Sequence, residues 1–432
     1  MSLSRKVSPV PKSNVPNRWI VAAAGFVMQV ALGAVYAWSV FRTPLVHRLH
    51  VSIPLVSLTF TITIFTLGLA AFAGGLWMRA KGPRVVGMTG GLLFGLGVYL
   101  ASFSGHGLWV LYLTYGILGG AGIGLSYIVP IATLVKWFPD RRGFITGVAV
   151  AGFGAGALVT APIATRLIQS IGVLQTFAWL GAASLVLVMG AAFFMEEPPA
   201  GWQPEGWNPA PGDLTAVASG YTLREALASW QFYALWGVLF LNVSAGISII
   251  SQASPMAQEI TGVNPALAAT MVGIISIANG AGRFLWAWLS DTFGRRWVFL
   301  AMFVLQAGVF SLLPGIHSFG LFTAFAFVIL LCYGGGFGTM PAFCADYFGS
   351  REVGSIYGLM LTAWGCGSAL GPMLIAHVRQ STGKYGQALF AVAAIMAASA
   401  VLPFFLKPPS RLGSARLASS TSPVPLLSSP IH

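Results

Sequence analysis

The sequence predicts an all-α membrane protein, with twelve transmembrane helices arranged as two pseudo-symmetric six-helix bundles. Of the 432 residues, 56% are hydrophobic and only 8% are charged, whereas a soluble domain has roughly 25% charged residues. Apolar runs recur along the chain, and most reach the length of about 20 residues that a spanning helix needs. A polar stretch in the middle divides them into two sets of six.

The spans are predicted from the apolar runs and their polar connections. The first set is Trp19–Val40, Ile53–Met78, Val85–Phe103, Leu108–Trp137, Phe144–Ser170 and Val173–Phe194. The second set is Trp230–Ala257, Ala266–Leu289, Trp297–Leu313, Phe319–Tyr347, Val353–Val378 and Gln387–Leu406. The chain then divides into a cytoplasmic N-terminal segment, a first bundle, a cytoplasmic linker, a second bundle and a disordered cytoplasmic tail, at residues 1–18, 19–195, 196–227, 228–406 and 407–432.

The basic residues predict the orientation of the chain. Of the 23 Lys and Arg residues, 17 fall in the termini, the linker and the loops on the same side as these. Because cytoplasmic loops carry an excess of Lys and Arg, we expect both termini in the cytoplasm and the protein in the plasma (inner) membrane. The same topology explains the formal net charge of +13, so no nucleic-acid partner is expected. The cysteines lack metal-site spacing, and we expect neither a metal nor a cofactor.

The two halves repeat one another weakly. The loop Gly82–Val85 matches Gly294–Trp297 at an offset of 212 residues, and Phe138–Gly147 matches Phe348–Gly358 at 210 to 211. A duplicated design favours a substrate site between the halves, near the bilayer midplane. Glycine runs inside the spans indicate close helix packing rather than phosphate-binding loops.

Arg283 is the one charge predicted deep in the membrane. All ten acids fall in loops or at helix ends, and Arg283 lies eight residues before Asp291, or about 12 Å into the membrane. An Arg at such depth costs about 2.5 kcal/mol or more unless it is paired or hydrated. We therefore expect a ligand carboxylate as its partner. The alternative is an Arg that snorkels or bonds helix carbonyls.

Four more residues near the middle of spans are candidates for the site. Asn279 lies one turn before Arg283, and it either steadies Arg283, binds the ligand or makes an ordinary interhelical hydrogen bond. Tyr36, Tyr127 and Tyr333 carry hydroxyls that need partners when buried. No nucleophile, metal cluster or paired acids suggest catalysis, so we predict no enzyme and no catalytic residues.

Several motifs resemble a known superfamily. The loop after the eighth span reads Asp291-Thr-Phe-Gly-Arg-Arg296, which resembles the loop signature of the major facilitator superfamily. In the first half Arg79 stands where the signature has Asp. Four further segments resemble the oxalate/formate antiporter family and the related monocarboxylate transporters: Tyr36-Ala-Trp-Ser39, Gly124-Leu-Ser-Tyr127, Lys136-Trp-Phe-Pro-Asp-Arg-Arg-Gly143 and Tyr357-Gly358.

This resemblance implies a cavity between the bundles. The oxalate transporter has two cavity cations, an Arg in span eight that Arg283 matches and a Lys in span eleven, where this chain has Trp364. Monocarboxylate transporters have an Asp at the position of Asn279. The cavity aromatics carry over to Tyr36, Tyr127, Phe153, Tyr333 and Phe337.

One cation suits a monoanion, because a dianion would leave one charge uncompensated in a medium of low dielectric constant. We therefore expect a secondary active transporter of a small monocarboxylate such as lactate, pyruvate or formate, which works by alternating access. Its partners would be the carboxylate substrate, a co-transported proton and the lipid bilayer, and we expect a monomer. The alternative is an anion exchanger for oxalate and formate, or for another organic anion.

Overall fold

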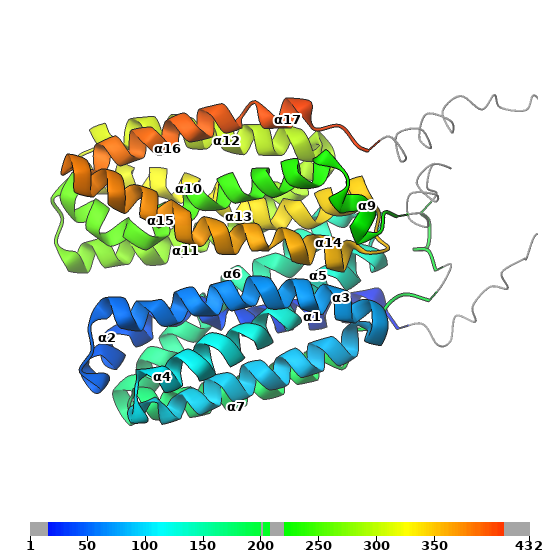
Figure 1. Cartoon of the computed structure of the whole chain (residues 1–432), viewed down its shortest axis with the longest axis horizontal. Coiled ribbons are helices and arrows are strands. Elements are labelled where there is room, and N and C mark those ends of the chain that lie inside the picture. The colour runs from blue at the N-terminus through cyan, green and yellow to red at the C-terminus, as the bar shows by residue number, and fades with distance from the viewer. Residues whose placement is uncertain (1–15, 200–201, 208–219, 410–432) are drawn as a thin grey trace, which may run out of the picture.

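The computed structural model describes residues 16–199, 202–207 and 220–409, and these residues form helices and connecting segments without any strand. Figure 1 shows two groups of long helices, coloured blue to cyan and green to orange, that lie side by side. The start of α1, the short helix α9 (Leu223–Leu227) and the end of α17 lie at one end of the molecule. We call this the linker end and the opposite one the outer end.

The first group is built from ten elements. These are α1 (Arg18–Leu32), η2 (Gly33–Ala37), α2 (Trp38–Leu49), α3 (Ile53–Leu100), η3 (Ala101–His106), α4 (Leu108–Leu111), η4 (Tyr112–Gly119), α5 (Gly120–Trp137), α6 (Arg142–Ile171) and α7 (Val173–Ala192). The second group comprises α10 (Trp230–Thr261), α11 (Pro265–Phe293), α12 (Arg295–Leu312), η5 (Leu313–Gly315), α13 (Phe319–Phe348), α14 (Val353–Met360), α15 (Thr362–Thr382), α16 (Tyr385–Ser399) and α17 (Leu402–Phe405).

These elements make twelve spans. Ten segments of the described chain are long and apolar enough to cross a membrane. The segment Leu55–His106 holds two spans, because Gly82, with a φ of 77°, breaks α3. The 29-residue α11 supplies the remaining one. The predicted fold class is confirmed, whereas the predicted domain limits stay predictions, since much of segments 1–18, 196–227 and 407–432 lies outside the described residues.

The first span differs from its prediction. It continues past Val40 to Leu49, and the 3₁₀ turn η2 interrupts it near the middle. The candidate residue Tyr36 lies in this turn. Short 3₁₀ segments within a helix change the direction of side chains and often mark functional hinges.

The two groups meet most extensively at two helix crossings, one between α3 and α14 and one between α6 and α11, and α13 and α15 add further contacts with α6 and α3. A methyl group on Gly358 would lie 2.6 Å from the carbonyl oxygen of Ala71, and one on Gly154 would lie 2.6 Å from Cα of Gly280. Only glycine permits such close approach of two backbones, as in other membrane helix pairs. The glycines of these spans therefore set the distance between the bundles.

A first polar latch closes the linker end between α6 and the second bundle. Asp291 accepts hydrogen bonds from the backbone N–H groups of Gly143 (3.0 Å) and Phe144 (2.8 Å), at the start of α6. Arg142 donates to Asp346 at 3.1 Å. A carboxylate at a helix N-terminus is stabilised by the free N–H groups and by the helix dipole.

A second latch has the opposite polarity. Arg79 is 212 residues before Asp291 and therefore holds the equivalent place in the first half. Its guanidinium pairs with Glu352 at 2.9 Å, just before α14. Glu352 is 2% exposed and also accepts a hydrogen bond from the backbone N–H of Leu223. The first half thus carries a positive residue where the loop signature has a negative one, and this residue still contacts the other bundle.

We expect Arg79 and Glu352 to be energetically coupled. In a double-mutant cycle of Arg79→Gln and Glu352→Gln, the coupling free energy should be about 1 kcal/mol, because Glu352 is buried and Arg79 half exposed. The measurement is the free energy of unfolding in mixed detergent micelles. Lys81→Gln in place of Arg79→Gln serves as the control, and equal coupling for both cations would contradict the second latch.

Candidate substrate-binding site

Arg283 lies at the centre of the molecule, on α11 and at the crossing with α6. It is ten residues before the end of α11 at Phe293, or about 15 Å along the helix. The side chain is fully buried, with 0% exposure. This confirms that a cation lies deep within the spans.

The guanidinium has only neutral hydrogen-bond partners. Nε donates to Oδ1 of Asn279 at 3.3 Å, Nη1 to the carbonyl oxygen of Val150 at 3.4 Å and Nη2 to the hydroxyl of Tyr36 at 3.2 Å. These bonds are at or beyond the long end of the usual range of 2.7–3.2 Å. Among the described residues no carboxylate lies within 4.0 Å of Arg283. The charge is therefore held loosely and left without a counter-ion.

Three aromatic rings surround the same guanidinium. Its central carbon lies 4.9 Å from the ring centre of Phe337, 5.4 Å from that of Phe153 and 5.9 Å from that of Tyr36. Rings within about 6 Å attract a cation through their quadrupole, by about 2 kcal/mol where the pair is desolvated. The rings offset part of the burial cost of the charge without neutralising it.

Trp364 of α15 joins the remaining rings into one cluster. Its ring centre lies 4.8 Å from Phe337, 6.1 Å from Phe153 and 6.3 Å from both Tyr36 and Tyr127. Tyr333 packs on Phe337 at 5.3 Å. All eight predicted site residues thus lie together between the bundles, and their role in binding a substrate stays a prediction.

Most side chains of the site are buried, whereas Tyr36 is partly exposed. The side chains of Arg283, Tyr127, Phe153, Tyr333 and Phe337 are 0% exposed, and that of Trp364 is 1% exposed.

The rings follow the internal repeat, but the charge does not. Phe153 and Trp364 are 211 residues apart, and Tyr127 and Phe337 are 210 apart. Arg283 corresponds to Ala71, 212 residues earlier. Both residues make the same backbone contact across the bundles. A methyl group built on Gly147 would lie 3.1 Å from the carbonyl oxygen of Arg283, and one built on Gly358 would lie 2.6 Å from that of Ala71.

Several buried polar atoms of the cluster make no hydrogen bond of good geometry among the described residues, although the hydroxyl of Tyr127 lies near that of Tyr357, and the hydroxyl of Tyr333 lies near Tyr36 and Trp364. Those predicted from the sequence are the hydroxyls of Tyr127 and Tyr333, and Nε1 of Trp364 is a third. Such orphans are rare in native proteins and call for an explanation. A ligand with several acceptor oxygens would satisfy all three donors.

Sequence reasoning missed three polar residues of this region. The hydroxyl of Tyr357 is buried next to that of Tyr127, and Oδ1 of Asn242 is buried without a partner among the described residues. Gln29 donates from Nε2 to the carbonyl oxygen of Tyr127 at 3.1 Å and so fixes α5 against α1. Each is a polar residue in an apolar span, and that signal was available for all three.

The model of the Major Facilitator Superfamily matches residues 19–259 and 237–430. The chain belongs to the major facilitator superfamily. This agrees with the twelve spans and with the loop motif after the eighth span, and it makes the protein a membrane transporter rather than an enzyme.

Within the superfamily, the chain is similar to transporters of small carboxylates and to one transporter that is uncharacterized. The chain is 29% identical to the uncharacterized MFS-type transporter YhjX of Escherichia coli, over 83% of this chain and 87% of that protein. It is 26% identical to the oxalate:formate antiporter of Oxalobacter formigenes (92% and 94%) and 27% identical to monocarboxylate transporter 13 of Rattus norvegicus (89% and 87%). The predicted resemblance to both groups is confirmed.

A solved superfamily structure supports the fold. The crystal structure of the E. coli fucose:proton symporter FucP is similar with a TM-score of 0.68 and 15% identity, and the match covers 90% of this chain and 98% of that one.

An unpaired buried charge should destabilise the protein in the absence of a ligand. We expect Arg283→Met to raise the free energy of unfolding in mixed micelles by about 2 kcal/mol, because the cost of the buried charge disappears. Gln29→Met is the control, since it removes a hydrogen bond between helices and should destabilise the protein. A lower stability for Arg283→Met would mean that its neutral partners compensate the charge.

Proposed function

We propose that this transporter carries a small monocarboxylate of the lactate, pyruvate or formate type, and that Arg283 binds the carboxylate. The observation that supports this most strongly is a fully buried guanidinium without a carboxylate partner among the described residues. Guanidinium and carboxylate match in charge and geometry and form two parallel hydrogen bonds. A carboxylate would replace long bonds to neutral acceptors with short, charge-assisted ones.

The residues around Arg283 orient the guanidinium, donate hydrogen bonds and form the apolar walls of the site. Asn279 accepts from Nε, and each terminal nitrogen keeps a second N–H for a ligand beside its bond to Val150 or Tyr36. The buried hydroxyls of Tyr127 and Tyr333 can donate to other substrate oxygens. Tyr36, Phe153, Phe337 and Trp364 form apolar walls that suit a small hydrocarbon body.

The single cation favours a monoanion over a dianion. A second carboxylate would lie among aromatic rings in a medium of low dielectric constant, without a second positive charge to offset it. The alternative is exchange of oxalate and formate, in line with what the relative from Oxalobacter formigenes is named for. The buried donors around the site, including Nε1 of Trp364, favour this second candidate, because oxalate offers more acceptor oxygens than formate or pyruvate.

Transport would follow alternating access with a proton carried along. The two latches close the linker end, so we propose that the substrate enters from the outer end and that the latches open to release it. An unliganded Arg283 resists passage through a closed state, whereas a bound carboxylate neutralises the guanidinium and lets the pair reorient. We propose proton symport as the coupling, and anion exchange is the alternative.

We further propose that the protein works as a monomer in the plasma (inner) membrane with both termini in the cytoplasm. The support is the excess of Lys and Arg at the linker end, which the positive-inside rule assigns to the cytoplasm.

Uptake into proteoliposomes tests the role of Arg283. We expect wild-type protein to take up radiolabelled lactate or formate, faster with an inward proton gradient, and Arg283→Ala to lose at least about 100-fold in rate. Arg283→Lys should lose most of the rate as well, because an ammonium cannot form the parallel pair of bonds. Arg48→Gln, an exposed residue of α2 outside the site, is the control. Robust transport by Arg283→Ala would refute the proposal.

A second cation should change the choice of anion. We expect Trp364→Lys to raise the affinity for oxalate relative to lactate by at least about tenfold, because it supplies the missing positive charge. The measurement is competition of unlabelled oxalate against labelled lactate or formate, with Trp364→Met as the neutral control. Wild-type protein that prefers oxalate to lactate would contradict the argument from a single cation.

A further inference from the structure

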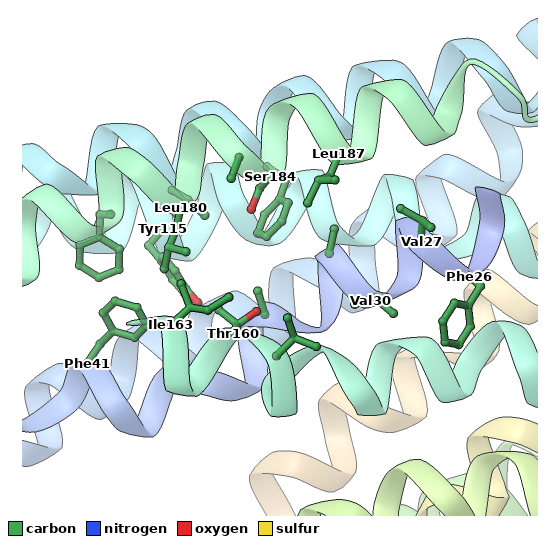
Figure 2. Close-up of a pocket in the computed structure, with 17 residues that line it drawn as sticks. Phe26, Val27, Val30, Phe41, Tyr115, Thr160, Ile163, Leu180, Ser184 and Leu187 are labelled. Atoms are coloured by element: carbon green, nitrogen blue, oxygen red, sulfur yellow. The ribbon is translucent and has the colours of Figure 1, made fainter. Parts of the chain in front are cut away.

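A deep apolar groove opens in the first bundle between α1, α6 and α7 (Figure 2). Its volume is about 410 Å³, within the usual range of 300–1,000 Å³ for ligand pockets. Phe94 and Phe177 are buried in its floor, and Val159, Ile163 and Leu187 form an exposed rim. Apart from three hydroxyls, of Tyr115, Thr160 and Ser184, its lining consists of hydrocarbon and backbone.

The groove runs parallel to the helices and has the length of one leaflet. Figure 2 shows its residues following α7 from Leu180 to Leu187, opposite Thr160 and Ile163 of α6. Along α7 it extends from Phe177 to Leu187, which is about 15 Å, or half of a hydrocarbon core of about 30 Å. It begins four residues from the outer end of α7 at Val173 and ends five residues from Ala192, so it crosses the middle of the membrane and is open to a chain that enters from the outer end.

A cation stands at the outer end of this groove. Arg166 is three residues after Ile163 on α6 and therefore lies one turn further out on the same helix face. It is exposed, and no described residue forms an ion pair with it. At this depth a long Arg side chain reaches the headgroup region.

We propose that the groove binds one phospholipid of the outer leaflet, with an acyl chain along α7 and the phosphate on Arg166. Water is not stabilised in an apolar groove, because it finds few hydrogen-bond partners there. The surrounding medium at this depth consists of lipid acyl chains. A chain seated between α6 and α7 gains packing contacts that lipids on a smooth helix surface lack. The groove lies outside the cluster around Arg283, so the inference does not depend on the proposed substrate.

Native mass spectrometry of the full-length protein, titrated with phosphatidylglycerol in detergent, tests the acyl-chain part. Ala183→Phe fills the groove, and we expect it to raise the dissociation constant of the tightest lipid-binding step at least about tenfold. The reason is that several methylene groups of the acyl chain can no longer be buried in the groove. Ala182→Phe is the matched control, since Ala182 is the adjacent exposed residue and does not line the groove. Equal affinity of these two variants would overturn the proposal.

The phosphate part is tested by Arg166→Gln against Arg48→Gln, an exposed Arg at the same end of the molecule. We expect the first to weaken binding about fivefold and the second to leave it unchanged, whereas equal effects would refute the headgroup assignment. Val159→Trp closes the groove from the α6 wall and replaces Ala183→Phe if that variant does not yield a folded monomer. Diacylglycerol, which has no phosphate, should bind wild type and Arg166→Gln equally.

Discussion

The buried charge of Arg283 is the constraint on which the central arrangement depends. A guanidinium in the middle of a membrane protein must be neutralised, hydrated or surrounded by groups that tolerate it. Here it has three long hydrogen bonds and three ring faces, and no carboxylate among the described residues. Neutral partners lower the cost of the charge without removing it, so the site remains attractive to an anion. A fixed acid next to Arg283 would stabilise the fold and weaken that attraction.

Close helix crossings fix the distance between the two bundles. The glycines of α6 and α14 bring backbone against backbone, as Gly154 and Gly358 illustrate. Such crossings leave the bundles little freedom to shift sideways, whereas they can still rock about the line of contact. The latches at the linker end then decide which side is closed, because they bridge the bundles away from the central cluster. The glycine crossings set the distance between the two bundles, and the ion pairs of the latches hold the linker end closed.

Much of the fold follows from the sequence, because in a bilayer the apolar runs are themselves the helices. The depth of Arg283 was predictable for the same reason, since counting residues along a helix gives distance. The interruption of the first span by η2 was not, because a 3₁₀ turn leaves no mark on hydropathy. Nor was the pairing of Arg79 with Glu352, because residues more than 250 apart in sequence meet only through the arrangement of the helices. The groove between α6 and α7 is likewise a property of packing.

Both the central site and the latches show which features of the repeat can diverge. Ring positions persist between the halves, as Phe153 and Trp364 illustrate, and so do the backbone contacts of Gly147 and Gly358. Charge has diverged instead: Arg283 corresponds to Ala71, and Arg79 corresponds to Asp291. A packed crossing admits few substitutions, since a single methyl group there would collide with the facing backbone. A charge can be replaced or inverted wherever a partner across the interface changes with it, as Glu352 has for Arg79. The duplicated scaffold thus keeps its geometry while its electrostatics, and with them the ligand it attracts, differ between the halves.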